Sequence, residues 1–284
     1  MVLISATSFG TLPIFAKLGY SSGLGTEQTL AYRFTLAAVG MLALAFIVRQ
    51  NPLRLQRRHL LALLAMGAIV YTGQSQTYFL ALHSLPASVV VLIVYSYPSL
   101  VVVAGWLFLD RRISLRHGAA LVGSFAGVAM LIGGAHFQAS WPLALAIVTP
   151  VIYTLFILLG ERVMGDVPAV AGSAVIMTGA AFSFCLITLL SGELTLARSS
   201  AQWLVAIGIA IVPTMLAISL FLGSLPRVGA ARASLLSTWE PVVAVGLAVA
   251  FLGDRLAFIQ IVGGALVLIA VIAAQTSRPV EPPA

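Results

Sequence analysis

Residues 86–109 read PASVVVLIVYSYPSLVVVAGWLFL, and residues 229–252 read GAARASLLSTWEPVVAVGLAVAFL. Each segment is apolar and carries a proline near its middle, Pro98 in one and Pro241 in the other. A hydrocarbon core about 30 Å thick takes about 20 helical residues, so each segment is long enough to cross a bilayer. At an offset of 143 residues, eight of the 31 positions from 82 to 112 are identical in the two segments. The pair therefore indicates an internal repeat.

Apolar stretches of this kind recur along the whole chain and are separated by short polar or glycine-containing breaks. Lipid offers no hydrogen bonds to the backbone, so each stretch is expected to be a helix. The breaks at 83–85 and 226–227 could instead be kinks in longer helices, which would reduce the count to nine or eight. The ten expected spans are residues 2–18, 27–48, 60–82, 86–109, 115–133, 141–160, 168–190, 201–225, 228–252 and 256–274.

The matched segments are the fourth and the ninth span, so the repeat unit has five spans. An odd number of spans inserts the second copy upside down relative to the first, an arrangement that recurs in secondary transporters. We therefore predict an all-α membrane protein of ten transmembrane helices in two inverted five-helix repeats. The repeats are residues 1–134 and 141–275, and residues 276–284 form a tail.

Lysine and arginine set the expected orientation of these spans. With the N-terminus in the cytoplasm, eleven arginines fall in inside segments, whereas Lys17, Arg198 and Arg255 fall outside. This bias agrees with the positive-inside rule. Removing either doubtful break alone would move the later basic loops outside, so the bias also favours ten spans. We expect both termini in the cytoplasm of a bacterial inner-membrane protein.

Composition excludes several other classes of protein. The chain is 61% hydrophobic and only 8% charged, whereas soluble domains are about 45–50% apolar and about 25% charged. The net charge of +7 flanks apolar spans rather than lining one face, which argues against nucleic-acid binding. The single cysteine allows no intrachain disulfide or Cys/His metal spacing, and no GxxxxGK[ST] phosphate loop is present. We expect no metal, no cofactor and no enzymatic activity.

The two prolines mark the expected functional site at the middle of the bilayer. Proline removes a backbone hydrogen bond and frees a carbonyl one turn earlier, so Pro98 and Pro241 are candidate hinges. Polar residues flank both, and they either patch the broken helix or face a shared cavity. Polar stripes in three spans add further candidates, which either face the bundle interior or a water-filled space, or make interhelical hydrogen bonds. They are Thr7, Ser8 and Thr11 in the first span, Tyr71, Gln74, Ser75 and Tyr78 in the third, and Thr149, Tyr153 and Thr154 in the sixth. The expected substrate-binding residues are Thr7, Gln74, Tyr78, Tyr95, Tyr97, Ser99, Tyr153, Trp239 and Glu240.

Two charged residues inside spans each have two interpretations. Glu240 is the one carboxylate placed deep within a span, and such a residue costs about 2.5–3.5 kcal/mol on insertion scales. It could bind a substrate amine or carry a proton, or it could be a neutral acid bonded to a freed carbonyl. Arg33 could snorkel to the interface or make a structural pair, or it could contact a substrate carboxylate.

A small-residue motif in the fifth span also has two interpretations. Gly123 and Gly127 form a GxxxG pattern, which allows helices to approach closely. The pattern is common in membrane helices. Packing within the chain is therefore expected ahead of dimerisation, and the oligomeric state stays open.

Four short motifs in this order resemble EamA-type members of the drug/metabolite transporter superfamily over essentially the whole chain. They are YRF at 32–34, AARAS at 230–234, EP at 240–241 and GDR at 253–255. The first repeat departs from this pattern, because DRR stands at 110–112 and Tyr97 replaces the acid before the proline. Within the superfamily, the chain is most similar to YddG-type bacterial exporters of aromatic and other amino acids.

This resemblance implies alternating-access export of amino acids, aromatic or neutral and of broad range, across the inner membrane through a central cavity. The expected partners are a small-molecule substrate and the lipid bilayer. The alternatives are export of drugs or other metabolites by the same fold, and a non-transporting membrane scaffold. An intramembrane enzyme is the third and weakest alternative.

Overall fold

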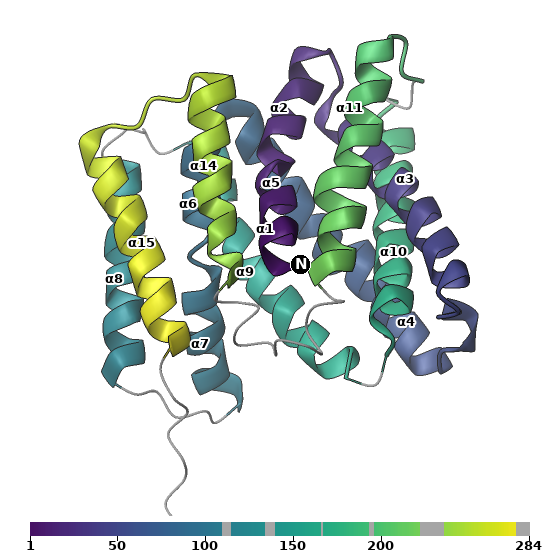
Figure 1. Ribbon diagram of the computed structural model, residues 1–284, viewed down its shortest axis with the longest axis horizontal. Coiled ribbons are helices and arrows are strands. Elements are labelled where there is room, and N and C mark those ends of the chain that lie inside the picture. The colour runs from purple at the N-terminus through teal and green to yellow at the C-terminus, as the bar shows by residue number, and fades with distance from the viewer. Residues whose placement is uncertain (110–114, 134–139, 166, 193–195, 222–235, 277–284) are drawn as a thin grey trace, which may run out of the picture.

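The computed structural model describes residues 1–109, 115–133, 140–165, 167–192, 196–221 and 236–276, and every regular element in them is a helix (Figure 1). The all-helical fold predicted from the sequence is confirmed. The first half contains α1 (Val2–Gly10), α2 (Leu12–Ser21), α3 (Thr26–Ile47), η1 (Pro52–Arg54), α4 (Arg57–Ala65), η2 (Met66–Tyr71), α5 (Thr72–Ser84), α6 (Ala87–Val94), α7 (Tyr97–Leu109) and α8 (Leu115–Gly133). The second half contains α9 (Trp141–Val163), α10 (Ala169–Leu190), α11 (Ser200–Ala210), η3 (Ile211–Leu216), α14 (Trp239–Leu252) and α15 (Phe258–Thr276).

The helices stand side by side along one common direction (Figure 1). In this view α8 and α15 form one edge, α3, α10 and α11 form the other, and α1, α2, α5 and α9 lie between them. The two edges are the most extensively packed helix pairs, α8 against α15 and α3 against α10. Each of these pairs joins the two halves of the chain.

Several of these helices are suited to a membrane by length and apolarity. In the described part of the chain, five stretches are long and apolar enough to cross a bilayer: Val2–Ser21, Thr26–Ile47, Trp141–Gly160, Ala169–Leu190 and Ser200–Phe221. Four shorter apolar helical stretches accompany them: Ala87–Val101, which spans α6 and the start of α7, Gly118–Ile132, Trp239–Leu252 and Phe258–Ala273. The total of ten spans stays a prediction. The DRR turn at 110–112, the break at 226–227, the AARAS run at 230–234 and the tail from 277 onward lie outside the described residues.

The two matched prolines each lie just after a break in a helix. Pro98 is the second residue of α7, which follows α6 after a turn at Tyr95 and Ser96. Pro241 is the third residue of α14, which begins after a turn at Thr238. Proline cannot donate to the preceding turn, but it fits the first turn of a new helix. The chain therefore starts a new helix at each site instead of kinking a continuous one, and the hinge role stays a prediction.

Two π-helical segments occupy corresponding places in the two halves, in the third and the eighth span. η2 precedes α5, and η3 follows α11. Each is stabilised by a threonine hydroxyl that donates to the carbonyl five residues earlier: Thr72 to Gly67 at 2.9 Å and Thr214 to Ile209 at 2.8 Å. Segments of this kind are rare and often occur at functional sites. They were not predicted from the sequence, because the apolar pattern continues through them.

Glycines let the halves approach at the α8–α15 edge. A Cβ added to Gly127 would lie 2.6 Å from the Gly263 carbonyl oxygen, and a Cβ added to Gly263 would lie 2.7 Å from the Gly127 carbonyl oxygen. Neither distance is sterically allowed, so only glycine permits this contact. The fifth-span motif therefore serves packing within the chain through Gly127. A Cβ at Gly123 would make an ordinary 3.5 Å contact with Ala270.

Candidate functional site: a tyrosine-lined cavity

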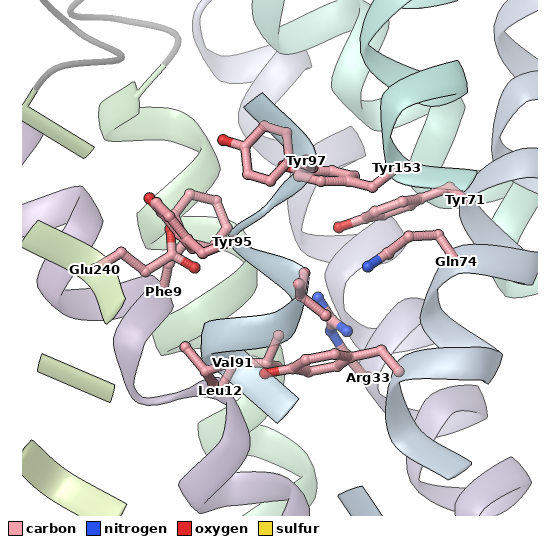
Figure 2. Close-up of a pocket in the computed structure, with 12 residues that line it drawn as sticks. Phe9, Leu12, Arg33, Tyr71, Gln74, Val91, Tyr95, Tyr97, Tyr153 and Glu240 are labelled. Carbon is pink, nitrogen blue, oxygen red and sulfur yellow. The ribbon is translucent and has the colours of Figure 1, made fainter. Parts of the chain in front are cut away.

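A cavity of about 80 Å³ lies among helices of both halves (Figure 2). Its walls come from α1, α2, α3, η2, α5, α6, α7, α9 and α14. Six of its lining side chains are aromatic, five tyrosines and one phenylalanine, and they lie beside charged and amide groups, a mixture typical of small-molecule sites. The lining residues are Phe9, Leu12, Arg33, Tyr71, Gln74, Tyr78, Val91, Val94, Tyr95, Tyr97, Tyr153 and Glu240.

The structure brings six of the nine expected binding residues to this cavity: Gln74, Tyr78, Tyr95, Tyr97, Tyr153 and Glu240. Thr7, Ser99 and Trp239 are not among its lining residues. Thr7 is exposed on α1, and Trp239 is 46% exposed even though it directly precedes Glu240. Successive helical residues point about 100° apart, so a tryptophan beside a cavity-lining residue faces away from the cavity. That the six lining residues bind substrate stays a prediction.

Four of the lining tyrosines belong to one continuous series of packed aromatic rings. Tyr97 packs edge-on against Tyr95 and Tyr153, with ring centroids 5.7 Å and 4.6 Å away. Phe156 stacks on Tyr153 at 6.1 Å and on Tyr71 at 4.8 Å. Aromatic pairs in these geometries add about 0.5–1.5 kcal/mol beyond the area that they bury. This series of rings is therefore held by packing between helices from both halves.

Arg33 lies inside the protein, which overturns the snorkelling interpretation. It is only 3% exposed and lines the cavity from α3. Its Nε donates to the Thr214 hydroxyl at 3.0 Å, and its guanidinium carbon lies 4.7 Å from the Phe34 ring centroid and 5.6 Å from that of Phe79. An arginine guanidinium stacks favourably on aromatic rings. An unpaired guanidinium in hydrocarbon is costly. The η3 segment and the two rings therefore hold this cation against the cavity.

Glu240 lines the same cavity from the first turn of α14. In Figure 2 it lies beside Tyr95, while Gln74 and Tyr71 project from the opposite side. Within the described residues, the Arg33 guanidinium contacts Thr214, Tyr71 and two phenylalanine rings, and no ion pair joins it to Glu240. The cavity thus presents one cationic and one acidic group that do not neutralise each other directly.

A hydrogen bond connects the two proline-associated breaks. The Tyr95 hydroxyl, at the break between α6 and α7, donates to the backbone carbonyl of Ser237, just before α14. The carbonyl belongs to the segment whose helical pairing is interrupted ahead of Pro241. Tyr95 therefore joins the corresponding breaks of the two halves beside the cavity.

Most of the other polar residues in the expected stripes donate hydrogen bonds to carbonyls of their own helices. Ser8 donates to the Ile4 carbonyl at 2.8 Å, and Thr154 donates to the Pro150 carbonyl at 2.8 Å. Thr149 donates to the Leu145 carbonyl and also contacts Thr77 across α5 and α9. For these residues the interpretation as helix-patching or interhelical hydrogen bonds is the one that the structure supports.

Several lining residues were missed by reasoning from the sequence. Tyr71 belongs to the polar stripe of the third span but was not among the expected binding residues, because nothing in the sequence indicates that η2 directs it into the cavity. Phe9, Leu12, Val91 and Val94 carry no sequence signal that separates a cavity wall from a lipid-facing surface. Ser75, in the same stripe as Tyr71, is buried and donates to the neighbouring Gln74 side chain at 3.3 Å.

Comparison with known proteins supports the same fold and assigns a family. A family model described as the EamA-like transporter family matches residues 1–133 and again residues 140–275. The chain is 26% identical over 275 residues to the uncharacterized transporter YcbK of Bacillus subtilis (strain 168), covering 92% of this chain and 87% of that protein. One crystal structure of another protein matches 96% of this chain and 94% of its own, with a TM-score of 0.70 and 19% identity. This last likeness shows the fold alone.

Proposed function

This chain belongs to the EamA-like transporter family of the drug/metabolite transporter superfamily, and within that family we propose that it exports amino acids. It is a multi-pass membrane transporter and not an enzyme. The proposed substrates are neutral and aromatic amino acids. The proposed location is the bacterial inner membrane with both termini in the cytoplasm, which the distribution of arginine supports.

The observation that carries the proposal is that Arg33 and Glu240 line one cavity without pairing with each other. An α-amino acid carries a carboxylate and an ammonium on adjacent atoms, so it offers one charge to each group. Charge-assisted hydrogen bonds contribute about 1.5–3 kcal/mol each, and more is lost when one partner is left buried and unsatisfied. Gln74 and the tyrosine hydroxyls add neutral donors, and the tyrosine rings suit an apolar or aromatic side chain.

The size of the cavity supports transport by alternating access. Its volume of about 80 Å³ is well below the ~300 Å³ at the lower end of ligand pockets, so the walls must separate to admit an amino acid. The breaks before Pro98 and Pro241 are the proposed hinges. Because the Tyr95–Ser237 hydrogen bond joins the two breaks, movement at one is coupled to movement at the other.

The direct test is uptake of labelled phenylalanine into proteoliposomes containing the full chain. Two analogues each lack one charge: phenethylamine has no carboxylate, and 3-phenylpropionate has no amine. We expect each to compete at least about tenfold more weakly than unlabelled phenylalanine, because each forfeits one charge-assisted contact. Replacing Arg33 with Gln should abolish the advantage of the carboxylate, and Glu240→Gln should abolish the advantage of the amine.

A matched control is Thr7→Val, which alters a span hydroxyl outside the cavity lining and should leave uptake unchanged. Uptake no faster than into empty liposomes would reject amino-acid export. If phenethylamine competes as well as phenylalanine does, the substrate is an amine or a cationic drug, which is the second candidate for this family fold.

A further inference from the structure

A second cavity, of about 390 Å³, opens where α3 ends and where α4 and α10 begin. Its walls include the side chains of Arg49, Arg54, Arg58 and His59, and no carboxylate is among the described residues that line it. Three guanidinium groups around one hollow repel each other unless an anion sits between them. The lining therefore favours an anionic ligand. This cavity is separate from the tyrosine-lined one, and the two share no lining residue.

The loop that carries these arginines is folded and fixed to the second half of the chain. Asn51 accepts a hydrogen bond from the Leu53 backbone N–H at 2.9 Å, and Pro52 is buried. The Gln50 side chain accepts from the backbone N–H of Val170, in the first turn of α10, at 3.1 Å. Arg49 holds a left-handed backbone conformation, with φ of 59°, which is uncommon outside glycine. The basic side chains are thus presented by a defined backbone rather than by a loose connection.

Two helix N-termini add to the positive potential of this cavity. α4 begins after Gln56 and α10 begins after Pro168, and both of these residues line the cavity. Neither N-cap residue makes a side-chain capping hydrogen bond. Gln50 occupies one N–H of the first turn of α10, and the helix dipole and the remaining first-turn N–H groups attract phosphate and other anions. Charge, cavity and helix termini point to the same class of ligand.

Exposed apolar side chains close in sequence to the lining residues favour a lipid over a free anion. Ile47 is 76% exposed, Leu53 is 78% exposed and Leu61 is 55% exposed, all within a few residues of the lining arginines. A free phosphate makes no favourable contact with apolar side chains, whereas the acyl chains of a phospholipid pack against them. Basic pockets at membrane depth on the inner side of transporters are suited to acidic headgroups. We propose that this cavity binds the headgroup of an acidic phospholipid, with the acyl chains against these exposed residues.

The test measures binding of fluorescent phosphatidylglycerol to the purified full chain in detergent. Wild-type protein should bind this lipid at least about tenfold more tightly than fluorescent phosphatidylcholine, and 10 mM inorganic phosphate should not displace it. Equal binding of the two lipids would overturn the proposal without any variant being made. Displacement by phosphate would also overturn it, because the site would then recognise a free anion.

A pair of matched variants locates the site. Arg54→Gln with Arg58→Gln removes two charges from the cavity, and phosphatidylglycerol binding should weaken about tenfold. Arg57→Gln with Arg162→Gln removes two exposed arginines that do not line it, and binding should stay within about twofold of wild type. Equal losses in the two variants would show attraction by overall charge and would reject a defined site. Size-exclusion elution identical to wild type confirms that each variant is folded.

Discussion

The two halves of the chain share a fold but contribute unequally to the cavity. Of the twelve residues that line it in the described part of the chain, ten come from the first half, and the second half supplies Tyr153 and Glu240. Tyr97 stands at the position that matches Glu240 in the internal repeat, so a tyrosine in one half corresponds to a carboxylate in the other. The repeat therefore preserves where the helices break, but not the chemistry at the break.

At the edge of the molecule, in contrast to the cavity, the two halves contribute the same kind of residue. At the α8–α15 contact, Gly127 and Gly263 each exclude a Cβ because of the carbonyl oxygen of the other. The π-helical segments η2 and η3 likewise use a threonine in the same way in each half. Where the two copies must fit together, the constraint is reciprocal. Where they line the cavity, the two copies can carry different side chains.

The unequal cavity is tested most strongly at the matched pair Tyr97 and Glu240. Glu240→Gln should lower kcat/KM for amino-acid transport at least about tenfold, because a charge-assisted contact of about 1.5–3 kcal/mol is lost. Tyr97→Phe keeps the ring that packs 4.6 Å from Tyr153 and should change kcat/KM by less than about threefold. Proteoliposome uptake measures both. Similar losses in the two variants would mean that the halves contribute equally.

The reciprocal packing is tested at Gly127. In Gly127→Ala the new methyl group would lie 2.6 Å from the Gly263 carbonyl oxygen, which must cost about 1–3 kcal/mol as the helices separate. The melting temperature in detergent should fall by several degrees. Gly123→Ala is the control, because its Cβ meets Ala270 at an ordinary 3.5 Å and the substitution favours helix. A stable Gly127→Ala variant would contradict the proposed fit.

The smallest expected effect is at the hydrogen bond that joins the two breaks. Tyr95→Phe removes the bond to the Ser237 carbonyl, and a neutral bond contributes about 0.5–1.5 kcal/mol. We expect a transport rate reduced by less than about tenfold, with little change in KM. Ser99→Ala is the control, since its buried hydroxyl has no hydrogen-bond partner among the described residues and should be dispensable. A Tyr95→Phe variant as fast as wild type would show that the breaks move independently.

The buried Arg33 shows why part of the site could not be predicted from the sequence. Six residues away from the start of an apolar span, Arg33 has the sequence context of a snorkelling side chain. Its actual partners, Thr214 and Phe79, are distant in the chain and meet it only after η3 and α5 pack against α3. In contrast, the polar stripe of the third span includes Gln74 and Tyr78, and both line the cavity, because polar groups avoid lipid on any single helix. That they bind substrate stays a prediction.

The sequence by itself determined that this is an all-helical membrane protein built from two copies of one unit. Apolar length, basic flanks and repeated prolines are local properties, because the bilayer acts on each helix separately. Tertiary structure alone decided which polar residues share a cavity, that Arg33 faces inward, and that Trp239 and Thr7 do not line it. These outcomes depend on how each helix is rotated and on where π-helical turns shift its faces. Contacts between helices that are distant in the chain set both.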